Sequence, residues 1–310
     1  MQQDIIHIGE FTLLKKVLWT VLASAVVMGI AACGSDEASD SDFIGDKLDY
    51  KIVGIDPGAG IMDLTINTVL PEYGLDDDWT VETSSGTAMA AELKKAIDKK
   101  EPIIVTGWIP HWKFSRYDLK MLDDPKGAFK GEEDINTLVR LGLKDDHPGA
   151  YKFFDQFKWE PDDLQDVMLK IEKGQKEQEA AKEWVEDHKD LVDKWTKGVK
   201  SGKGEKLKMT YVAWDDVIAS SNVVKYVLEH ELDYEVELLQ VEAGPMFAGV
   251  ADGSADAMVG AWMPTTHKAY YDKYKGKFED LGVNLTGTRN GLAVPAYMDI
   301  DSIEDLKKDK

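Results

Sequence analysis

The chain has 310 residues, of which 43% are hydrophobic, so it is long enough for one large domain or two smaller domains with real cores. Its formal net charge is −21, from 58 acidic and 37 basic residues. Because phosphate binding needs a basic surface, this balance argues against nucleic acid as a partner. The acidic residues are spread along the chain, as in a solvated surface.

The N-terminal segment has the features of a secretory signal. Lys15 and Lys16 precede an apolar stretch from Val17 to Ala32, and the single cysteine of the chain, Cys33, follows directly. The stretch of about sixteen residues is short for a membrane span, which needs about twenty. With small residues just before the cysteine, the pattern predicts a lipoprotein signal peptide over 1–32 and lipidation of Cys33. The alternative is a signal anchor in which the cysteine is incidental.

Residues 33–47 are rich in small and acidic residues, which predicts a flexible tether. A short strand from Ile52 to Asp56 follows and leads into the turn Pro57–Ile61, ahead of a helix that begins near Met62. Backbone N–H groups at such a glycine-containing turn favour an anion. The turn lacks the Gly-Lys-Ser/Thr ending of a P-loop and the third glycine of a dinucleotide fingerprint, so a plain tight turn remains the other reading.

Three further apolar runs each end on a tryptophan. They are Ile103–Trp108, Met209–Trp214 and Met258–Trp262, and each reads as a short buried parallel strand. Ligands of open α/β sheets sit beyond the carboxyl ends of such strands, so the three indoles are expected to meet there. A cage of aromatic faces suits a quaternary ammonium, which cannot donate hydrogen bonds. The alternative is that each tryptophan only packs at the edge of a sheet and binds no ligand.

An internal repeat supports the convergence of these strands. Segments 48–125 and 206–280 share the order strand, helix, strand, glycine turn, helix, strand, Trp-x-Pro, with Trp108-Ile109-Pro110 matching Trp262-Met263-Pro264. Two similar α/β units joined by a long connection predict two lobes that face each other across a cleft. Trp108 then comes from one lobe and the other two tryptophans from the second.

A helical insert separates the repeats. Pro161 with acidic residues in the first turn starts one helix, and a second is expected from Lys176 to Lys197. Trp159, Trp184 and Trp195 belong to this insert and are interpreted as packing residues. A last strand over Asn290–Pro295 is expected to cross back to the first lobe. The predicted organisation is therefore a signal peptide (1–32), a tether (33–47), lobe 1 (48–140), the helical insert (141–205), lobe 2 (206–285) and a C-terminal strand and helix (286–310).

Polar residues near the predicted cleft give no sign of catalysis. His111 has no second histidine or cysteine at metal-ligand spacing, and it is expected to fix the loop that presents Trp108. Asp56, Asp215 and Asp216 end or follow strands, where helix N-caps are the usual role. His267, five residues beyond Trp262, is either a donor to a carboxylate or a surface histidine. There is no nucleophile elbow, so neither an enzyme nor a cofactor or metal is expected.

Five motifs in order resemble the glycine betaine-binding lipoproteins of ABC importers. They cover the chain from about Lys47 to its C-terminus and read IDPGAGIM (55–62), TGWIPHWKFSRY (106–117), YVAWDD (211–216), VEAGPMF (241–247) and AWMPTTHKAYYDKYKGK (261–277). The resemblance implies a two-lobed, periplasmic-binding-protein-like α/β fold. It also implies that a prism of Trp108, Trp214 and Trp262 holds a trimethylammonium group. The carboxylate would be held by the backbone N–H groups of Gly60 and Ile61 and by His267.

The implied function is capture of glycine betaine, and with it proline betaine, as compatible solutes. Partners would be an ABC permease with its ATPase, and the location would be the outer face of the cell membrane, through the lipid on Cys33. Choline or carnitine are the alternatives within the class. Choline lacks a carboxylate, so the Gly60 turn and His267 would have no role. A secreted enzyme acting on choline compounds is the alternative from another class.

Overall fold

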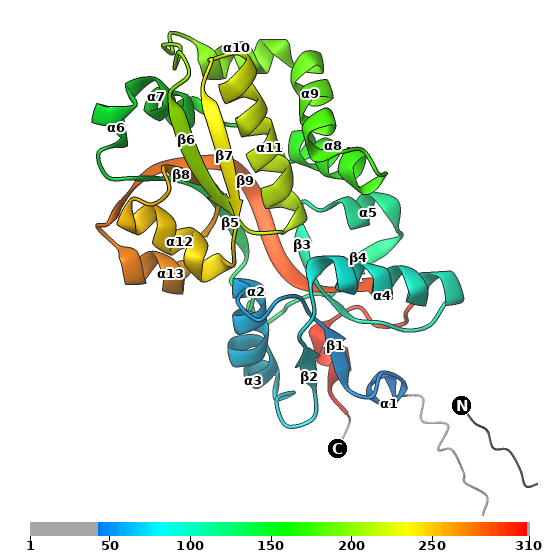
Figure 1. The fold of residues 1–310 in the computed structure, drawn as a ribbon. Coiled ribbons are helices and arrows are strands. Elements are labelled where there is room, and N and C mark those ends of the chain that lie inside the picture. Colours follow the sequence, from blue (N-terminus) through cyan, green and yellow to red (C-terminus); the bar gives the residue numbers. More distant parts are fainter. Residues whose placement is uncertain (1–42, 309–310) are drawn as a thin grey trace, which may run out of the picture. The chain divides into compact units, whose positions relative to one another are not determined.

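The computed structural model describes residues 43–308, so the predicted signal peptide, Cys33 and most of the tether lie outside the described residues. Within this part of the chain the strands form one nine-stranded mixed sheet (Figure 1). Its order is β2-β1-β3-β9-β5-β8-β6-β7, and β4 pairs with β9. Helices pack against the sheet, which confirms the predicted α/β class.

The first lobe contains a small parallel sheet. β1 (Lys51–Val53) lies between β2 (Thr80–Glu82) and β3 (Val105–Ile109), and pairs with both in parallel. β4 (Leu119–Met121) follows. Its helices are α2 (Gly60–Leu64), the π-helix η1 (Thr65–Val69), α3 (Leu70–Tyr73), α4 (Gly86–Lys99) and α5 (Trp112–Arg116). α1 (Ile44–Lys47) precedes β1 and forms a helix at the end of the stretch 33–47 that the sequence predicted to be a flexible tether.

The second lobe repeats this arrangement, as the sequence predicted. β6 (Lys206–Tyr211) pairs in parallel with β7 (Glu235–Gln240) on one side and with β8 (Ala257–Met263) on the other. Its helices are α11 (Asp215–His230), α12 (Ala243–Asp252) and α13 (Lys268–Tyr274). β8 is buried along nearly its whole length, which explains why its sequence is a continuous apolar run.

Two long strands run between the lobes. β9 (Phe278–Pro295) has 18 residues; it pairs with β5 (Glu132–Arg140) over most of its length and with β3 and β4 towards its C-terminal end. β5 pairs on its other side with β8 of the second lobe. The crossing strand expected at Asn290–Pro295 is thus the end of a longer one, and the short helix η2 (Ile303–Leu306) follows it.

The segment between the repeats is helical. α6 (Leu143–Asp146) and α7 (Pro148–Gln156) precede α8 (Pro161–Glu172), whose first turn carries a reciprocal capping box between Glu160 and Asp163. The single helix expected from Lys176 to Lys197 is instead two, α9 (Glu177–Asp187) and α10 (Lys189–Thr196), which meet at His188. Trp159, Trp184 and Trp195 pack edge-to-face or stacked on one another in the core of this insert, as expected.

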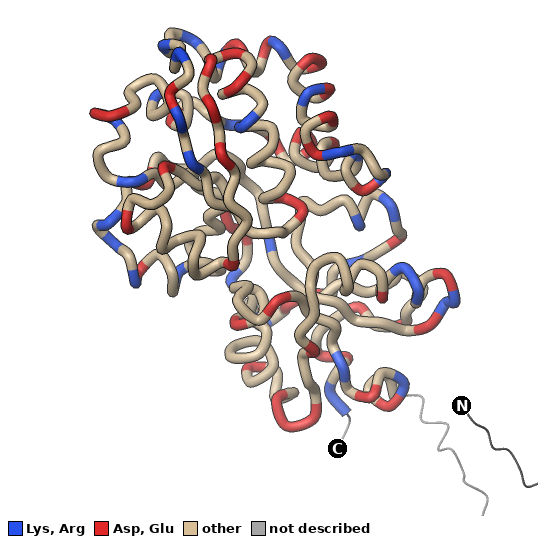
Figure 2. The backbone as a smooth tube through the Cα atoms, viewed as in Figure 1, with Lys and Arg blue, Asp and Glu red and all other residues tan. Residues whose placement is uncertain are grey.

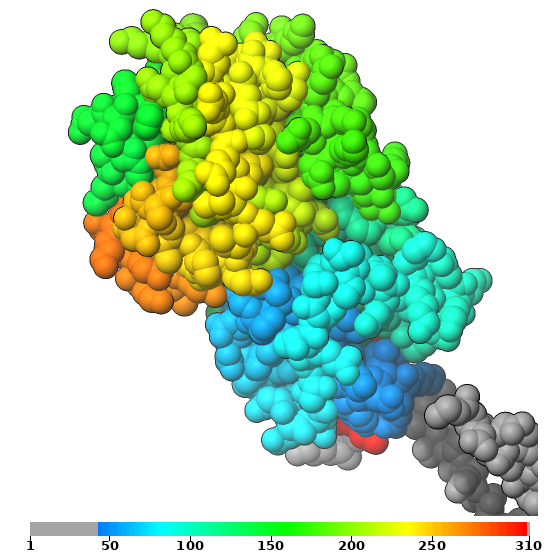
Figure 3. All heavy atoms as spheres, in the orientation of Figure 1, coloured from blue at the N-terminus to red at the C-terminus, as the bar shows by residue number. Residues whose placement is uncertain are grey.

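The two lobes lie against each other. On the face drawn in Figure 3, the blue and cyan atoms of the first lobe touch the yellow and orange atoms of the second without a wide gap. Figure 2 shows acidic residues distributed over both lobes and the insert, in keeping with a solvated acidic surface. No helix among residues 43–308 is both long and apolar enough to cross a membrane.

Candidate functional site

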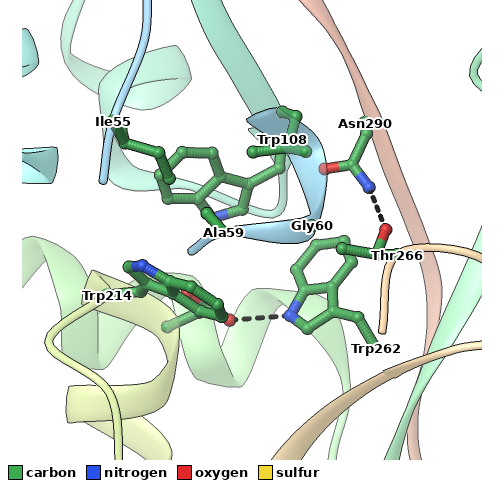
Figure 4. A pocket seen from close by; sticks show the side chains of 10 residues that line it. Ile55, Ala59, Gly60, Trp108, Trp214, Trp262, Thr266 and Asn290 are labelled. Atoms are coloured by element: carbon green, nitrogen blue, oxygen red, sulfur yellow. Dashed lines mark hydrogen bonds between the residues drawn. The ribbon is translucent and has the colours of Figure 1, made fainter. Parts of the chain in front are cut away.

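One cavity collects residues from both lobes, and all three predicted cage tryptophans line it (Figure 4). It encloses about 280 Å³ of empty space, including the part open to solvent. Figure 4 shows the indoles of Trp108, Trp214 and Trp262 around a common space. The remaining lining residues are Ile55, Ala59, Gly60, Ile61, Asp216, Thr266 and Asn290. Among the described residues, no group of three or more histidine, cysteine, aspartate or glutamate side chains could hold a metal ion.

Trp108 stands near the end of β3 and is 5% exposed. His111 packs edge-on against its indole with ring centroids 4.6 Å apart, and the His111 Nδ1 accepts a 3.2 Å hydrogen bond from the Lys113 backbone N–H at the start of α5. This confirms the predicted role of His111 in fixing the loop behind Trp108. The Lys113 Nζ lies 4.0 Å from the centroid of the Trp108 ring, in a fully buried position that the sequence did not suggest.

Trp214 and Trp262 are each oriented by a carboxylate. The Trp214 Nε1 donates a 2.7 Å hydrogen bond to the Asp56 Oδ2, and the Trp262 Nε1 donates a 3.0 Å bond to the Asp216 Oδ2. Asp215 accepts a 3.0 Å bond from the Trp112 Nε1. The expectation that these three aspartates cap helices is therefore wrong. Ala59 and Trp214 occupy the N-cap positions of α2 and α11. The three aspartate side chains hold indoles, and that of Asp216 also accepts backbone N–H groups in the first turn of α11.

The glycine turn approaches the opposite lobe closely. Gly60 and Ile61 begin α2, where backbone N–H groups have no intrahelical acceptor. A Cβ on Gly60 would lie 2.0 Å from the Thr266 backbone oxygen, so a side chain there does not fit this arrangement. Across the cleft, the Tyr270 hydroxyl donates a 2.9 Å hydrogen bond to the Gly58 carbonyl.

His267 is close to the cage but is not part of the cavity lining. It is fully buried, its ring is stacked on Trp214 with centroids 5.4 Å apart, and its Nδ1 accepts a 3.0 Å hydrogen bond from the Trp262 backbone N–H. Because Nδ1 accepts, the proton of the neutral ring sits on Nε2, which is buried and has no hydrogen-bond partner in the structure. Burial lowers the pKa of His267 to about 3, so the surface-loop reading of this histidine is wrong.

The sequence did not indicate two of the polar lining residues. Thr266 and Asn290 belong to a buried cluster around Glu133 of β5, whose Oε1 accepts hydrogen bonds from the Thr265 and Thr266 backbone N–H groups at 2.6 and 2.7 Å. The Asn290 Nδ2 donates to the Thr266 Oγ1 at 2.6 Å and to the Glu133 Oε2 at 3.0 Å. The position of Asn290 follows from the pairing of β9 with β3 and β5, which no local pattern shows. The sequence did indicate Asp216 as a residue near the cleft, because it closely follows the cage tryptophan Trp214 at the end of a predicted strand.

The sequence of this chain matches a known family of transport proteins. Residues 35–187 and 205–310 match the family described as the substrate binding domain of ABC-type glycine betaine transport systems. The match covers most of the chain, and the chain belongs to this family. It is a substrate-binding protein of an ABC importer and not an enzyme.

One relative is similar over nearly the full length. It is the glycine betaine/carnitine transport binding protein of Listeria monocytogenes, which is 48% identical over 96% of this chain and 100% of its own length. Among solved structures, a lactococcal protein in its closed, glycine betaine-bound conformation shares 47% identity over 48% of this chain and 58% of its own, with a TM-score of 0.46. A glycine betaine, L-proline-binding protein of Borrelia burgdorferi shares 43% identity over 49% of this chain and 57% of its own, with a TM-score of 0.46. Both superpositions span less than two thirds of the solved chain.

Proposed function

We propose that this substrate-binding protein captures glycine betaine, and also proline betaine, as compatible solutes for uptake. The single observation that carries the proposal is the presence of Trp108, Trp214 and Trp262 in the wall of one cavity. Desolvated cation–π contacts contribute up to roughly 2 kcal/mol per ring, and a quaternary ammonium cannot satisfy a conventional hydrogen-bonding site. Micromolar affinity requires about 8 kcal/mol, which three rings and a bound carboxylate can supply.

The carboxylate of the ligand would meet three donors. Two are the backbone N–H groups of Gly60 and Ile61 at the start of α2, where the helix dipole also favours negative charge. The third is the Nε2–H of His267, a buried donor with no other partner. Such a group is costly to leave unsatisfied, which supports a ligand acceptor beside it.

The mechanism we propose is closure of the two lobes around the ligand. Lobe 1 (48–140) supplies Trp108 and the Gly60 turn, and lobe 2 (206–285) supplies Trp214, Trp262 and His267. β5 and β9, which run between the lobes, would act as the hinge, and closure would complete the cage. The closed protein would then deliver its ligand to a membrane permease with its ATPase.

Ligand choice is tested by calorimetry with glycine betaine, proline betaine, carnitine and choline. We expect glycine betaine to bind in the micromolar range and choline much more weakly, because choline has no carboxylate for the Gly60 turn. Carnitine is the second candidate, because the Listeria relative carries it in its name. Strong binding of choline, with no heat of binding when glycine betaine is added, would overturn the assignment.

We also propose that the protein is tethered to the outer face of the cell membrane by a lipid on Cys33. The proposal rests on the basic and apolar residues that precede this cysteine. Cys33→Ala should release the protein from the membrane or leave an unprocessed precursor, with betaine binding intact. Membrane fractionation and the size of the mature chain are the measurements. Normal processing with unchanged membrane partition would favour a signal anchor.

A further inference from the structure

A buried carboxylate lines the cavity together with the three indoles. Asp216 lies in the first turn of α11 and is 2% exposed. Its Oδ2 accepts the hydrogen bond from the Trp262 Nε1, so the carboxylate is fixed beside one cage ring. Asp216 forms no salt bridge with any lysine, arginine or histidine of residues 43–308. A buried carboxylate without a cation is costly, and a cation placed in the cavity would offset that cost.

The charged groups around Asp216 come from three elements. Asp215 precedes it on α11, and Asp56 follows β1 in the opposite lobe. His111 and Lys113, at and just after the start of α5, supply the basic groups. The His111 Nε2 lies 3.0 Å from the Asp215 Oδ2, but burial and the Lys113 charge lower the pKa of His111 to about 4, so it is neutral near pH 7.

Lys113 is the remaining source of positive charge. Its Nζ is buried without a hydrogen-bond partner and faces the Trp108 ring, and burial lowers its pKa to about 7, against the pull of Asp215 and Asp216. At neutral pH this lysine is therefore only partly charged. With Asp215 half-buried and Asp216 fully buried beside a lysine that is only partly charged, these groups carry an excess of negative charge, which a cationic ligand would balance.

We propose that Asp216 is the counter-ion of the ligand's quaternary ammonium and adds to the selection for its positive charge. This inference rests on the proposed function and refines it: the three indoles favour a trimethylated cation through cation–π contacts, and Asp216 adds a full counter-charge that favours a charged head over a neutral one. A carboxylate and a quaternary ammonium that share one cavity lined mostly by buried residues attract each other more strongly than they would in water.

The sharpest test uses a ligand pair that differs only in charge. Glycine betaine and 3,3-dimethylbutyrate have the same shape, with nitrogen replaced by carbon in the second. We expect the wild type to prefer glycine betaine strongly in calorimetry. Asp216→Asn keeps an oxygen to accept from Trp262 but removes the charge, so it should bind glycine betaine about tenfold more weakly and reduce the preference over 3,3-dimethylbutyrate by a similar factor.

Asp193→Asn is the matched control. Asp193 is an exposed residue of α10 in the helical insert, and its removal changes the total charge by the same amount. This variant should keep both the affinity and the preference of the wild type. If Asp216→Asn also keeps both, the inference is overturned while the proposed function stands. If the wild type binds neither compound, both fail.

A second readout needs no change at Asp216. Burial raises the pKa of its carboxyl to about 6, and a bound cation would lower it again. Betaine binding should therefore release protons near pH 6, seen as a binding heat that depends on the ionisation enthalpy of the buffer, and affinity should fall as the pH drops below 6. Lys113→Met removes the other group that titrates near neutrality and should leave this release intact. No proton release near pH 6 in either protein would overturn the inference.

Discussion

The indole of Trp214 donates a 2.7 Å hydrogen bond from Nε1 to the Oδ2 of Asp56, and this bond joins the two lobes. Trp214 opens α11 in the second lobe, while Asp56 follows β1 in the first. A cage ring thus also serves as a contact between the lobes. Trp112 and Asp215 form a second contact of the same kind in the opposite direction, at 3.0 Å. In the proposed mechanism, cage assembly and lobe closure are therefore coupled through these shared side chains.

Removing the Asp56 carboxylate should weaken glycine betaine binding. A hydrogen bond to a charged group contributes about 1.5–3 kcal/mol, and this one joins the two lobes that hold the ligand, so Asp56→Ala should reduce affinity by at least about tenfold. Calorimetry measures the affinity, and X-ray scattering measures how compact the betaine-bound protein is. Asp63→Ala, which changes an exposed acid of α2, is the control and should leave both unchanged. Wild-type affinity in Asp56→Ala would mean that closure does not depend on this bond.

A methyl group on Gly60 should block closure. The added Cβ would meet the Thr266 backbone oxygen at 2.0 Å, and a backbone atom cannot rotate away. Gly60→Ala keeps the backbone N–H, so any loss of affinity reports the steric clash and not a missing donor. We expect at least about a tenfold loss in calorimetry.

Gly58→Ala provides the matched control for the glycine turn. Its Cβ would lie 3.6 Å from the nearest atom, the Asp56 Oδ1, which is ordinary contact. It should bind betaine within about 0.5 kcal/mol of the wild type. Equal affinities for the two glycine variants would show that the lobes need not approach this closely.

Substitutions of the cage tryptophans should lower betaine affinity, whereas substitution of a tryptophan in the helical insert should lower stability. Trp108, Trp214 and Trp262, changed singly to alanine, should each lose roughly 1–2 kcal/mol or more of betaine binding. Trp184→Ala should instead lower the melting temperature, because a buried tryptophan removed from a core costs about 3–5 kcal/mol, while affinity stays nearly unchanged. Binding lost from Trp184→Ala and kept in the cage variants would mean that the site lies elsewhere.

The sequence predicted that the three tryptophans meet because the signal for each is local. Each tryptophan ends or follows a short apolar strand. The parallel strands β6 and β8 place their carboxyl ends at one edge, while β3 runs the opposite way and brings Trp108 to the same cavity from the other lobe. Asn290 and Glu133 could not be placed in the same way. They reach the cleft because β9 and β5 pair over long sequence separations, and alternating or apolar patterns do not specify such partners.

Burial was the other property that the sequence did not reveal. His267 and Lys113 look like loop and helix-surface residues in the sequence, yet both are fully buried by packing between distant elements. The sequence did not reveal the protonation state of His267 either. A histidine in a solvated loop would be partly charged near pH 6.5 and would bind a carboxylate more strongly as the pH falls. Burial removes that option for His267.

The effect of His267 on betaine binding should be large and independent of pH. With Nδ1 occupied by the Trp262 N–H, the neutral ring offers only its Nε2–H to the ligand carboxylate. His267→Ala removes this donor, so glycine betaine affinity should fall roughly ten- to hundredfold, as for one hydrogen bond to an ionised group. Choline, which has no carboxylate, should bind weakly to the wild type and change little in the variant.

The pH profile distinguishes a neutral donor from an imidazolium at this position. The folded-state pKa of about 3 lies below the unfolded value near 6.5, so His267 stays neutral from pH 8 down to pH 5 in the folded protein. The ratio of wild-type to His267→Ala affinity should therefore remain constant over that range, even where Asp216 changes both affinities together. Calorimetry at pH 8, 7, 6 and 5 measures the ratio. A ratio that rises as the pH falls would show that His267 binds as a cation, and wild-type affinity in His267→Ala would leave the carboxylate to the Gly60 and Ile61 amides alone.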